Sequence, residues 1–286
     1  MKIIVTTDST SDISKELLER RKISVSPLLV NLGDDEFIDG QNITNEDIFS
    51  YVDKTGILPK TAARSIEFYK DFFQEAMKKY NADYVVHISL SSELSSSYSN
   101  AKLAAEEIGN GKIEVINSLS LSSGCGLLCL SAADKIDAGL SFEEVVKQTR
   151  EEVSKVQASF ILNDLRYLYK GGRCSALAVF GANLLSIKPK IKLANGKMGV
   201  DKKYMGKYEN VLSKYTDDLL KDYPSPNLTR VYITYTTENA AVNEVLIKKL
   251  QGRGFKEIIT NFAGSTIASH CGKNCLGVLF LCENEV

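Results

Sequence analysis

The sequence predicts an α/β fold with two domains, because strand and helix patterns alternate along its first half and strands predominate in the second. The chain has 286 residues, a length that suits two domains or one large one. Short apolar runs rich in β-branched residues, such as 84–88, precede segments with helical periodicity. Strands joined by crossover helices form parallel sheets covered on both faces. We therefore expect an N-terminal parallel sheet with helices on both faces and a C-terminal mixed sheet with helices.

The elements of the first half follow from apolar runs that end in polar turns and lead into helical repeats. Thr44 and Ser65 stand directly before two such repeats and are typical N-cap residues. Polar segments at 33–39 and 59–61 are expected as a turn and a loop. The predicted elements are strand 3–6, helix 14–21, strand 23–31, helix 44–54, helix 65–80, strand 84–88, helix 98–108, strand 112–116 and helix 120–138.

The second half changes character after a long helix that begins at a capping box. Ser141 and Glu144 have the spacing in which each side chain bonds the backbone N–H of the other, and this helix should run to about residue 156. The domain boundary is placed there, giving an N-terminal domain of 1–156 and a C-terminal domain of 157–286. The pair Asn195-Gly196 predicts a β-hairpin. The other predicted elements are strand 159–162, helix 165–170, hairpin strands 187–193 and 197–204, helix 211–221, strand 230–236, helix 240–250, strand 257–260 and strand 278–282.

Composition and charge exclude several classes of protein. A net charge of −1 provides no basic field for nucleic acid. No apolar run approaches the ~18 residues of a membrane-spanning helix. Six cysteines in a chain without an export signal are typical of reduced thiols in the cytoplasm, the compartment we expect. Cys125 and Cys129 have helical spacing in an apolar segment and predict core packing, so we expect no metal site.

Serines crowd the turn between the strand at 84–88 and the next helix. Five of the seven residues at 91–97 are serines, whereas an N-cap requires one. The first-turn N–H groups of a helix lack intrahelical partners and carry partial positive charge, and hydroxyls add donors without charge. The pattern favours an anion or carboxylate site over simple capping. Ligands of parallel sheets bind at the carboxyl ends of the strands, so this turn, the Asp8 turn and the Thr61 loop should share one edge.

The residues able to carry out catalysis leave one enzymatic alternative open. A serine nucleophile requires a base, and the chain has two histidines. His87 falls inside a buried strand pattern, whereas His270 falls among turn residues, so Ser95 with His270 is a hypothetical acyl-hydrolase or acyltransferase pair. The G-x-S-x-G elbow is absent around Ser95. Neither a G-x-G-x-x-G turn nor a Walker A loop occurs, and we expect no cofactor.

Five motifs together resemble one protein family. Residues 8–12 read Asp-Ser-Thr-Ser-Asp, 60–65 read Lys-Thr-Ala-Ala-Arg-Ser, and 91–98 read Ser-Ser-Glu-Leu-Ser-Ser-Ser-Tyr. Residues 165–173 read Leu-Arg-Tyr-Leu-Tyr-Lys-Gly-Gly-Arg, and 270–274 read His-Cys-Gly-Lys-Asn. Each motif is weak alone. Five in this order and spacing, spread almost end to end, resemble the DegV family of bacterial fatty-acid-binding proteins.

The resemblance implies that one long-chain fatty acid, such as palmitate, binds in a cleft between the two domains. It implies that Thr61 and Ser95 hydrogen-bond the carboxylate, and that His270 and Arg173 join a polar network at the headgroup. Members of this family present the acyl chain to the catalytic subunit of a fatty acid kinase, which makes acyl phosphate for phospholipid synthesis. On this interpretation the chain is a carrier without catalytic residues, and any contact with a membrane is transient. A lipid sensor without a kinase partner is the other non-enzymatic interpretation.

Residues beside these motifs extend the predicted site. Arg64 replaces the proline of the family's T-S-Q-P-S loop, and Arg64 and Ser65 fall near the predicted anion edge, where an arginine pairs well with a carboxylate. Ser96 replaces the glycine that the family has after Ser95. A tail of about fifteen carbons provides ~12 kcal/mol gross at ~0.8 kcal/mol per buried CH₂, so an apolar lining is required. The candidate tail-lining residues, for which ordinary core packing is the alternative, are Phe160, Leu162, Phe180, Leu184 and Leu185.

Overall fold

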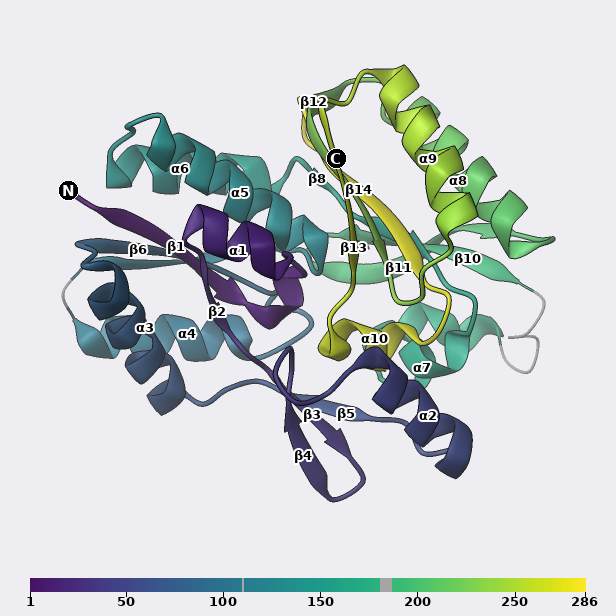
Figure 1. The fold of residues 1–286 in the computed structure, drawn as a ribbon, viewed down its shortest axis with the longest axis horizontal. Helices are drawn as coiled ribbons and strands as arrows, with labels where there is room; N and C mark the ends of the chain where they lie inside the picture. The colour runs from purple at the N-terminus through teal and green to yellow at the C-terminus, as the bar shows by residue number, and fades with distance from the viewer. Residues whose placement is uncertain (110, 181–186) are drawn as a thin grey trace.

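Three sheets organise the part of the chain that the computed structural model describes, residues 1–109, 111–180 and 187–286 (Figure 1). Sheet A is parallel, in the order β2-β1-β6-β7. Helices α3 and α4 pack on one face, and α1, α5 and α6 lie on the other. Its elements are β1 (Ile3–Asp8), α1 (Lys15–Arg21), β2 (Ser24–Ser26), α3 (Ile66–Tyr80), β6 (Tyr84–Ser89), α4 (Ser97–Ile108), β7 (Ile113–Asn117), α5 (Ser123–Asp137) and α6 (Phe142–Val153).

Sheet C is mixed and belongs to the second half of the chain. Its order is β11-β10-β9-β14-β12-β13, with β8 on β14, and its one parallel pair among the described strands is β12 with β13. Helices α8 and α9 cover one face (Figure 1). Its elements are β8 (Val156–Gln157), β9 (Ser159–Ile161), α7 (Leu165–Lys170), β10 (Lys188–Ala194), β11 (Lys197–Tyr204), α8 (Tyr208–Asp222), β12 (Pro226–Tyr235), α9 (Ala240–Arg253), β13 (Glu257–Phe262), α10 (Ser265–Cys271) and β14 (Leu276–Cys282).

The small antiparallel sheet B differs from the sequence-based expectation. The predicted strand 23–31 is two strands, because Pro27 has no N–H to continue the ladder of β2. The chain then enters sheet B, in the order β4-β3-β5, so the predicted turn 33–39 holds a strand and the predicted loop at 59–61 leads into one. Its elements are β3 (Leu29–Leu32), β4 (Asp35–Ile38), α2 (Asn45–Thr55) and β5 (Lys60–Ala62).

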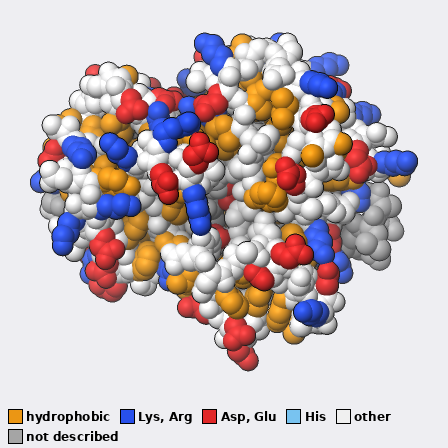
Figure 2. Space-filling view, viewed as in Figure 1, with side chains coloured by type: hydrophobic (Ala, Val, Ile, Leu, Met, Phe, Trp, Pro, Cys, Tyr) orange, Lys and Arg blue, Asp and Glu red, His pale blue; other side chains and the backbone are white. Residues whose placement is uncertain are grey.

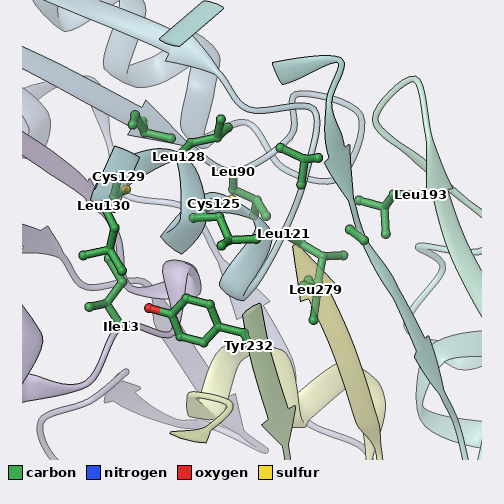
Figure 3. Packing of buried hydrophobic residues seen from close by; sticks show 14 of the residues in the cluster. Ile13, Leu90, Leu121, Cys125, Leu128, Cys129, Leu130, Leu193, Tyr232 and Leu279 are labelled. Carbon is green, nitrogen blue, oxygen red and sulfur yellow. The ribbon is translucent and has the colours of Figure 1, made fainter. Parts of the chain in front are cut away.

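Helix α5 connects the two large sheets. It contacts β1 and β6 of sheet A as well as β12 and β14 of sheet C. Figure 3 shows its buried side chains between residues of both halves, and one continuous hydrophobic cluster includes Leu128 of α5, Ile88 of β6 and Leu279 of β14. A Cβ on Gly126 would lie 2.7 Å from the carbonyl oxygen of Ser11, so close packing of protein against protein requires this glycine.

The two kinds of large sheet and their helices confirm the fold predicted from the sequence. The Asn195-Gly196 hairpin joins β10 to β11, and both residues have positive φ, at 50° and 80°, as a type I′ turn requires. The predicted domain boundary at residue 156 coincides with the start of β8, after α6 has ended. Helix α10 was not predicted. Within the described residues, no helix combines the length and the apolar character needed to cross a bilayer.

Candidate functional site

A cavity of about 390 Å³ lies where sheets A and B meet α10. It draws residues from both halves of the chain, and most of its wall is apolar. Its apolar lining residues are Leu28, Ala62, Ala63, Leu90, Leu94, Leu121, Met198, Ile267 and Cys271. Its polar lining residues are Thr10, Thr61, Ser95, Ser96, Arg173, Thr266 and His270. Both predicted carboxylate-binding residues, Thr61 and Ser95, therefore line one cavity with His270 and Arg173 of the predicted headgroup network.

Thr61 reaches the cavity from sheet B and not from the edge of the parallel sheet. It lies on β5 opposite Val30 of β3, and its Oγ1 is 2.8 Å from Nε2 of His270 on α10. Burial, with a smaller effect of Arg173, lowers the pKa of His270 to about 4, so the imidazole is neutral at pH 7. If Nε2 carries the ring proton and donates it to Thr61, the Thr61 hydroxyl proton is free to point into the cavity.

Ser95 enters the cavity from the turn before α4. Its Oγ lies 2.9 Å from Oγ of Ser97 and accepts a hydrogen bond from the Ser97 backbone N–H at 3.2 Å. Ser96, the N-cap residue of α4, makes no side-chain cap bond, and its φ of −77° is one that any residue adopts. The replacement of glycine by serine at position 96 therefore causes no backbone strain here.

The other predicted headgroup residues are used in different ways. Arg173 is exposed, lines the cavity and donates from Nη1 to the carbonyl oxygen of Gly171 at 2.7 Å. Arg64 does not line the cavity, because its Nε donates to the carbonyl oxygen of Pro27 at 2.6 Å and its guanidinium lies 4.5 Å from the ring centre of Phe68. Ser65 caps α3 by accepting the backbone N–H of Phe68.

The predicted tail-lining residues fall into three groups. Phe160 lines a second, smaller cavity of about 20 Å³, which shares Leu121, Ile267 and Cys271 with the main cavity. Leu162 is fully buried in the hydrophobic cluster and lines neither cavity. The Phe180 side chain and all of Leu184 and Leu185 lie outside what the structure describes.

Two buried carboxylates hold the N-terminus of α10, which carries His270. Asp12 accepts the backbone N–H of Gly264 at 2.8 Å and the hydroxyl of Ser122 at 2.5 Å. Asp39 accepts the backbone N–H of Ser265 at 2.9 Å. Burial, with a smaller contribution from Asp39, raises the pKa of Asp12 to about 8 despite these hydrogen bonds. The position of α10 against the cavity thus depends on contacts with the first 40 residues of the chain.

A larger open cleft of about 1220 Å³ lies beside this anchor, between α1, α2 and the end of β13. Figure 2 shows this face, where acidic and basic side chains are interspersed around a hollow. Its wall mixes polar residues with apolar ones such as Ile13, Leu18 and Phe49, and Lys273 at its margin pairs with Asp53 at 2.6 Å. Among the described residues, no group of three or more His, Cys, Asp or Glu side chains could hold a metal ion. All six cysteines, each in the described part of the chain, are buried and unpaired.

The sequence did not distinguish most of the apolar lining from core. Leu90 and Leu94 follow β6, Met198 lies on β11 and Ile267 lies on α10, so no periodic pattern joins them. Each would look the same in a packed interior. Their one common signal is position, since three of the four stand within a few residues of the serine-rich turn or of His270.

Comparison with known proteins gives a consistent result. A family model described as "Uncharacterised protein, DegV family" matches residues 2–283. A Thermotoga maritima protein named fatty acid-binding protein is 28% identical over 282 residues, which cover 97% of this chain and 96% of that protein. Protein DegV of Bacillus subtilis is 27% identical over 279 residues, covering 97% of this chain and 98% of its own.

Solved structures agree with the sequence relatives. A structure of a DegV family protein from Thermus thermophilus, described as fatty acid binding, matches with a TM-score of 0.90 at 27% identity, covering 99% of this chain and 100% of that one. The structure of DegV from Bacillus subtilis, described as a fatty acid binding protein, matches with a TM-score of 0.84 at 27% identity and with the same coverage.

Proposed function

Because the chain belongs to the DegV family, we propose that it binds one long-chain fatty acid in the cavity of about 390 Å³. Thr61 and Ser95 donate hydrogen bonds to the carboxylate in this proposal. The observation that carries it is the placement of these two hydroxyls, one from β5 and one from the turn before α4, in one mainly apolar cavity. Relatives named as fatty acid-binding proteins support the choice of ligand.

Neutral donors suit a carboxylate that must be held and released unchanged. A buried carboxylate without partners is very costly, and hydrogen bonds to a charged group contribute about 1.5–3 kcal/mol each. His270 is neutral at pH 7, so it orients Thr61 without transferring a proton to the ligand. The exposed guanidinium of Arg173 adds positive charge at the opening of the cavity.

The acyl tail extends toward the small cavity lined by Phe160 in this proposal. Leu121, Ile267 and Cys271 border both cavities, and they form the neck through which the tail passes. The small cavity has a volume of about 20 Å³, which is room for about one water and too little for several methylene groups. The tail therefore has to displace these neck side chains, and the neck contributes to chain-length selection.

A carrier role fits the site better than hydrolysis. Ser95 shares its hydroxyl with Ser97, whereas His270 bonds Thr61, so among the described residues no base contacts Ser95. We extend the proposal to a cytoplasmic carrier that presents the carboxylate, at the cavity opening near Arg173, to a fatty acid kinase that makes acyl phosphate for phospholipid synthesis. The family resemblance supports that partner. A lipid sensor would bind the same ligand without stimulating such a kinase.

The test is to purify the protein under native conditions, denature it, extract it with organic solvent and identify the extract by mass spectrometry. We expect a near-stoichiometric fatty acid, and a much smaller amount from the Thr61→Val/Ser95→Ala variant. An extract from wild type with a different anion, or with nothing, contradicts the proposal. Stable labelling of Ser95 by an activated acyl ester, lost in Ser95→Ala, would instead support the acyl-hydrolase alternative.

A further inference from the structure

A buried polar network lies directly behind Ser95 and has no role in the proposal so far. Asp8 at the end of β1 accepts the Tyr69 hydroxyl at 2.6 Å, the Ser89 hydroxyl at 2.7 Å and the Leu90 backbone N–H at 2.9 Å. Nε2 of His87 lies 3.6 Å from the same carboxylate. Asp8, Tyr69, Ser89 and His87 are each at most 1% exposed. The network therefore ends in a carboxylate that water does not reach.

The charge on Asp8 fixes the direction of the hydrogen bonds. Although burial favours its neutral form, the nearby His87 imidazole and the hydrogen bonds from Tyr69 and Ser89 hold the pKa of Asp8 below its ordinary value. An ionised carboxylate can only accept, so the single proton of Tyr69 is committed to Asp8. Burial raises the pKa of Tyr69 well above its ordinary range, so this proton stays on the phenol. The Tyr69 oxygen can then act only as an acceptor toward the buried Ser97 and Ser26 hydroxyls beside it.

Ser97 consequently has one proton and two acceptors, Tyr69 and Ser95. It is fully buried at the first position of α4, 2.9 Å from Ser95 by their Oγ atoms. If Ser97 donates to Tyr69, Ser95 donates to Ser97 and presents lone pairs to the cavity. If Ser97 donates to Ser95, the Ser95 proton is free for the cavity. An anion favours the second arrangement, because the Ser95 proton then reaches it without loss of the bond between the two serines, and the chain of donors polarises the Ser95 hydroxyl.

We propose that Ser97 is a positioning residue for carboxylate recognition, whose hydroxyl donates to the Ser95 oxygen and so orients the Ser95 hydroxyl as a donor toward the cavity. The inference rests on the proposed function, because it assumes a carboxylate at Ser95. Ser97 does for Ser95 what His270 does for Thr61, since each donates to the oxygen of a ligand-binding hydroxyl. A ligand with an alcohol head does not need this control, because its hydroxyl can donate or accept and fits either arrangement.

The experiment compares palmitate with hexadecan-1-ol, each titrated into delipidated wild type and variants by displacement of a fluorescent fatty acid. We expect Ser97→Ala to weaken palmitate binding up to about fivefold, because the Ser95 hydroxyl loses the donor that polarises it, and to change hexadecan-1-ol binding less than about twofold. Ser99→Ala is the matched control, because Ser99 is exposed in the same turn and donates to the Ser96 carbonyl oxygen. Ser97→Cys, which keeps the size of the side chain but donates weakly, should fall between wild type and Ser97→Ala.

A double-mutant cycle separates positioning from a structural role. In a Ser95→Ala background, Ser97→Ala should cause no further loss of palmitate affinity, because Ser97 acts through Ser95. Equal losses for both ligands, or additive losses in the cycle, would overturn the inference while leaving fatty acid binding intact. Failure of wild type to bind palmitate would instead overturn the proposed function, and this inference with it.

Discussion

Replacement of Thr61 by valine should weaken fatty acid binding through the head of the ligand and leave the contribution of the tail unchanged. Valine keeps the β-branched shape that suits β5 but removes the hydroxyl that faces His270 at 2.8 Å. A hydrogen bond to a charged group contributes about 1.5–3 kcal/mol, so the dissociation constant should rise by about 10- to 150-fold. Ser95→Ala combined with it should weaken binding further, and by at least about tenfold relative to wild type.

The assay is calorimetric titration of dodecanoate, tetradecanoate and hexadecanoate into delipidated protein at pH 8. Each buried CH₂ contributes ~0.8 kcal/mol, so binding free energy should change linearly with chain length. The line for Thr61→Val should run parallel to that for wild type, displaced by the loss at the headgroup. Thr229→Val, at an exposed position of β12, is the control and should coincide with wild type. A displacement of less than threefold, or a changed slope without displacement, would refute the assignment of Thr61 to the carboxylate.

Three further predictions concern stability. Because its pKa is raised to about 8, Asp12 binds more protons in the folded than in the unfolded protein between about pH 4 and 8, so stability falls as pH rises through this window. Asp12→Asn should therefore reduce the loss of Tm between pH 6 and 9. Identical pH profiles of Tm for wild type and variant would contradict this. His270, with its pKa lowered to about 4, affects stability in the opposite direction. The free energy of unfolding of wild type should fall by up to about 3 kcal/mol as pH falls from 6.5 to 4. Measured by urea unfolding, His270→Gln should show a flatter dependence on pH over that range. Gly272 has a φ of 69°, and a Cβ there would lie 2.6 Å from Cδ2 of Tyr167, so Gly272→Ala should cost at least about 2 kcal/mol of stability. Gly139→Ala is the control and should cost less, because φ is 84° there but nothing lies within 4 Å of the added Cβ. Equal losses in Tm for the two variants would show that the clash with Tyr167 is relieved.

Local signals in the sequence predicted the elements whose ends depend on their own residues. Thr44, Ser65 and Ser141 cap α2, α3 and α6 as predicted, because a capping bond involves atoms only three residues apart. Helix α10 has no such signal. Apart from His270, the residues of Ser265–Cys271 are small or β-branched, the N-cap Gly264 makes no side-chain bond, and the first turn is held by Asp39, far away in the sequence. Tertiary contacts and not propensity therefore determine this helix.

The candidate site shows the same division. Thr61, Ser95, Arg173 and His270 were chosen together from motifs, and the structure brings them to one cavity, although their roles toward a ligand stay predictions. Arg64 was also chosen, but an arginine can satisfy its donors on a carbonyl oxygen and stack on a ring, as it does here with Pro27 and Phe68. The sequence alone does not tell which partner an arginine in a loop will take.

The hydrogen bond between Thr61 and His270 joins residues that are 209 positions apart in the chain. At about 5–20 residues per second, a ribosome adds His270 some 10–40 s after Thr61. For most of that interval, once Ser95 has been added, the hydroxyls on β5 and before α4 are already made, but the wall that α10 provides is not. The cavity is therefore completed only after α10 has been synthesised, and any ligand that needs His270 must load after that point.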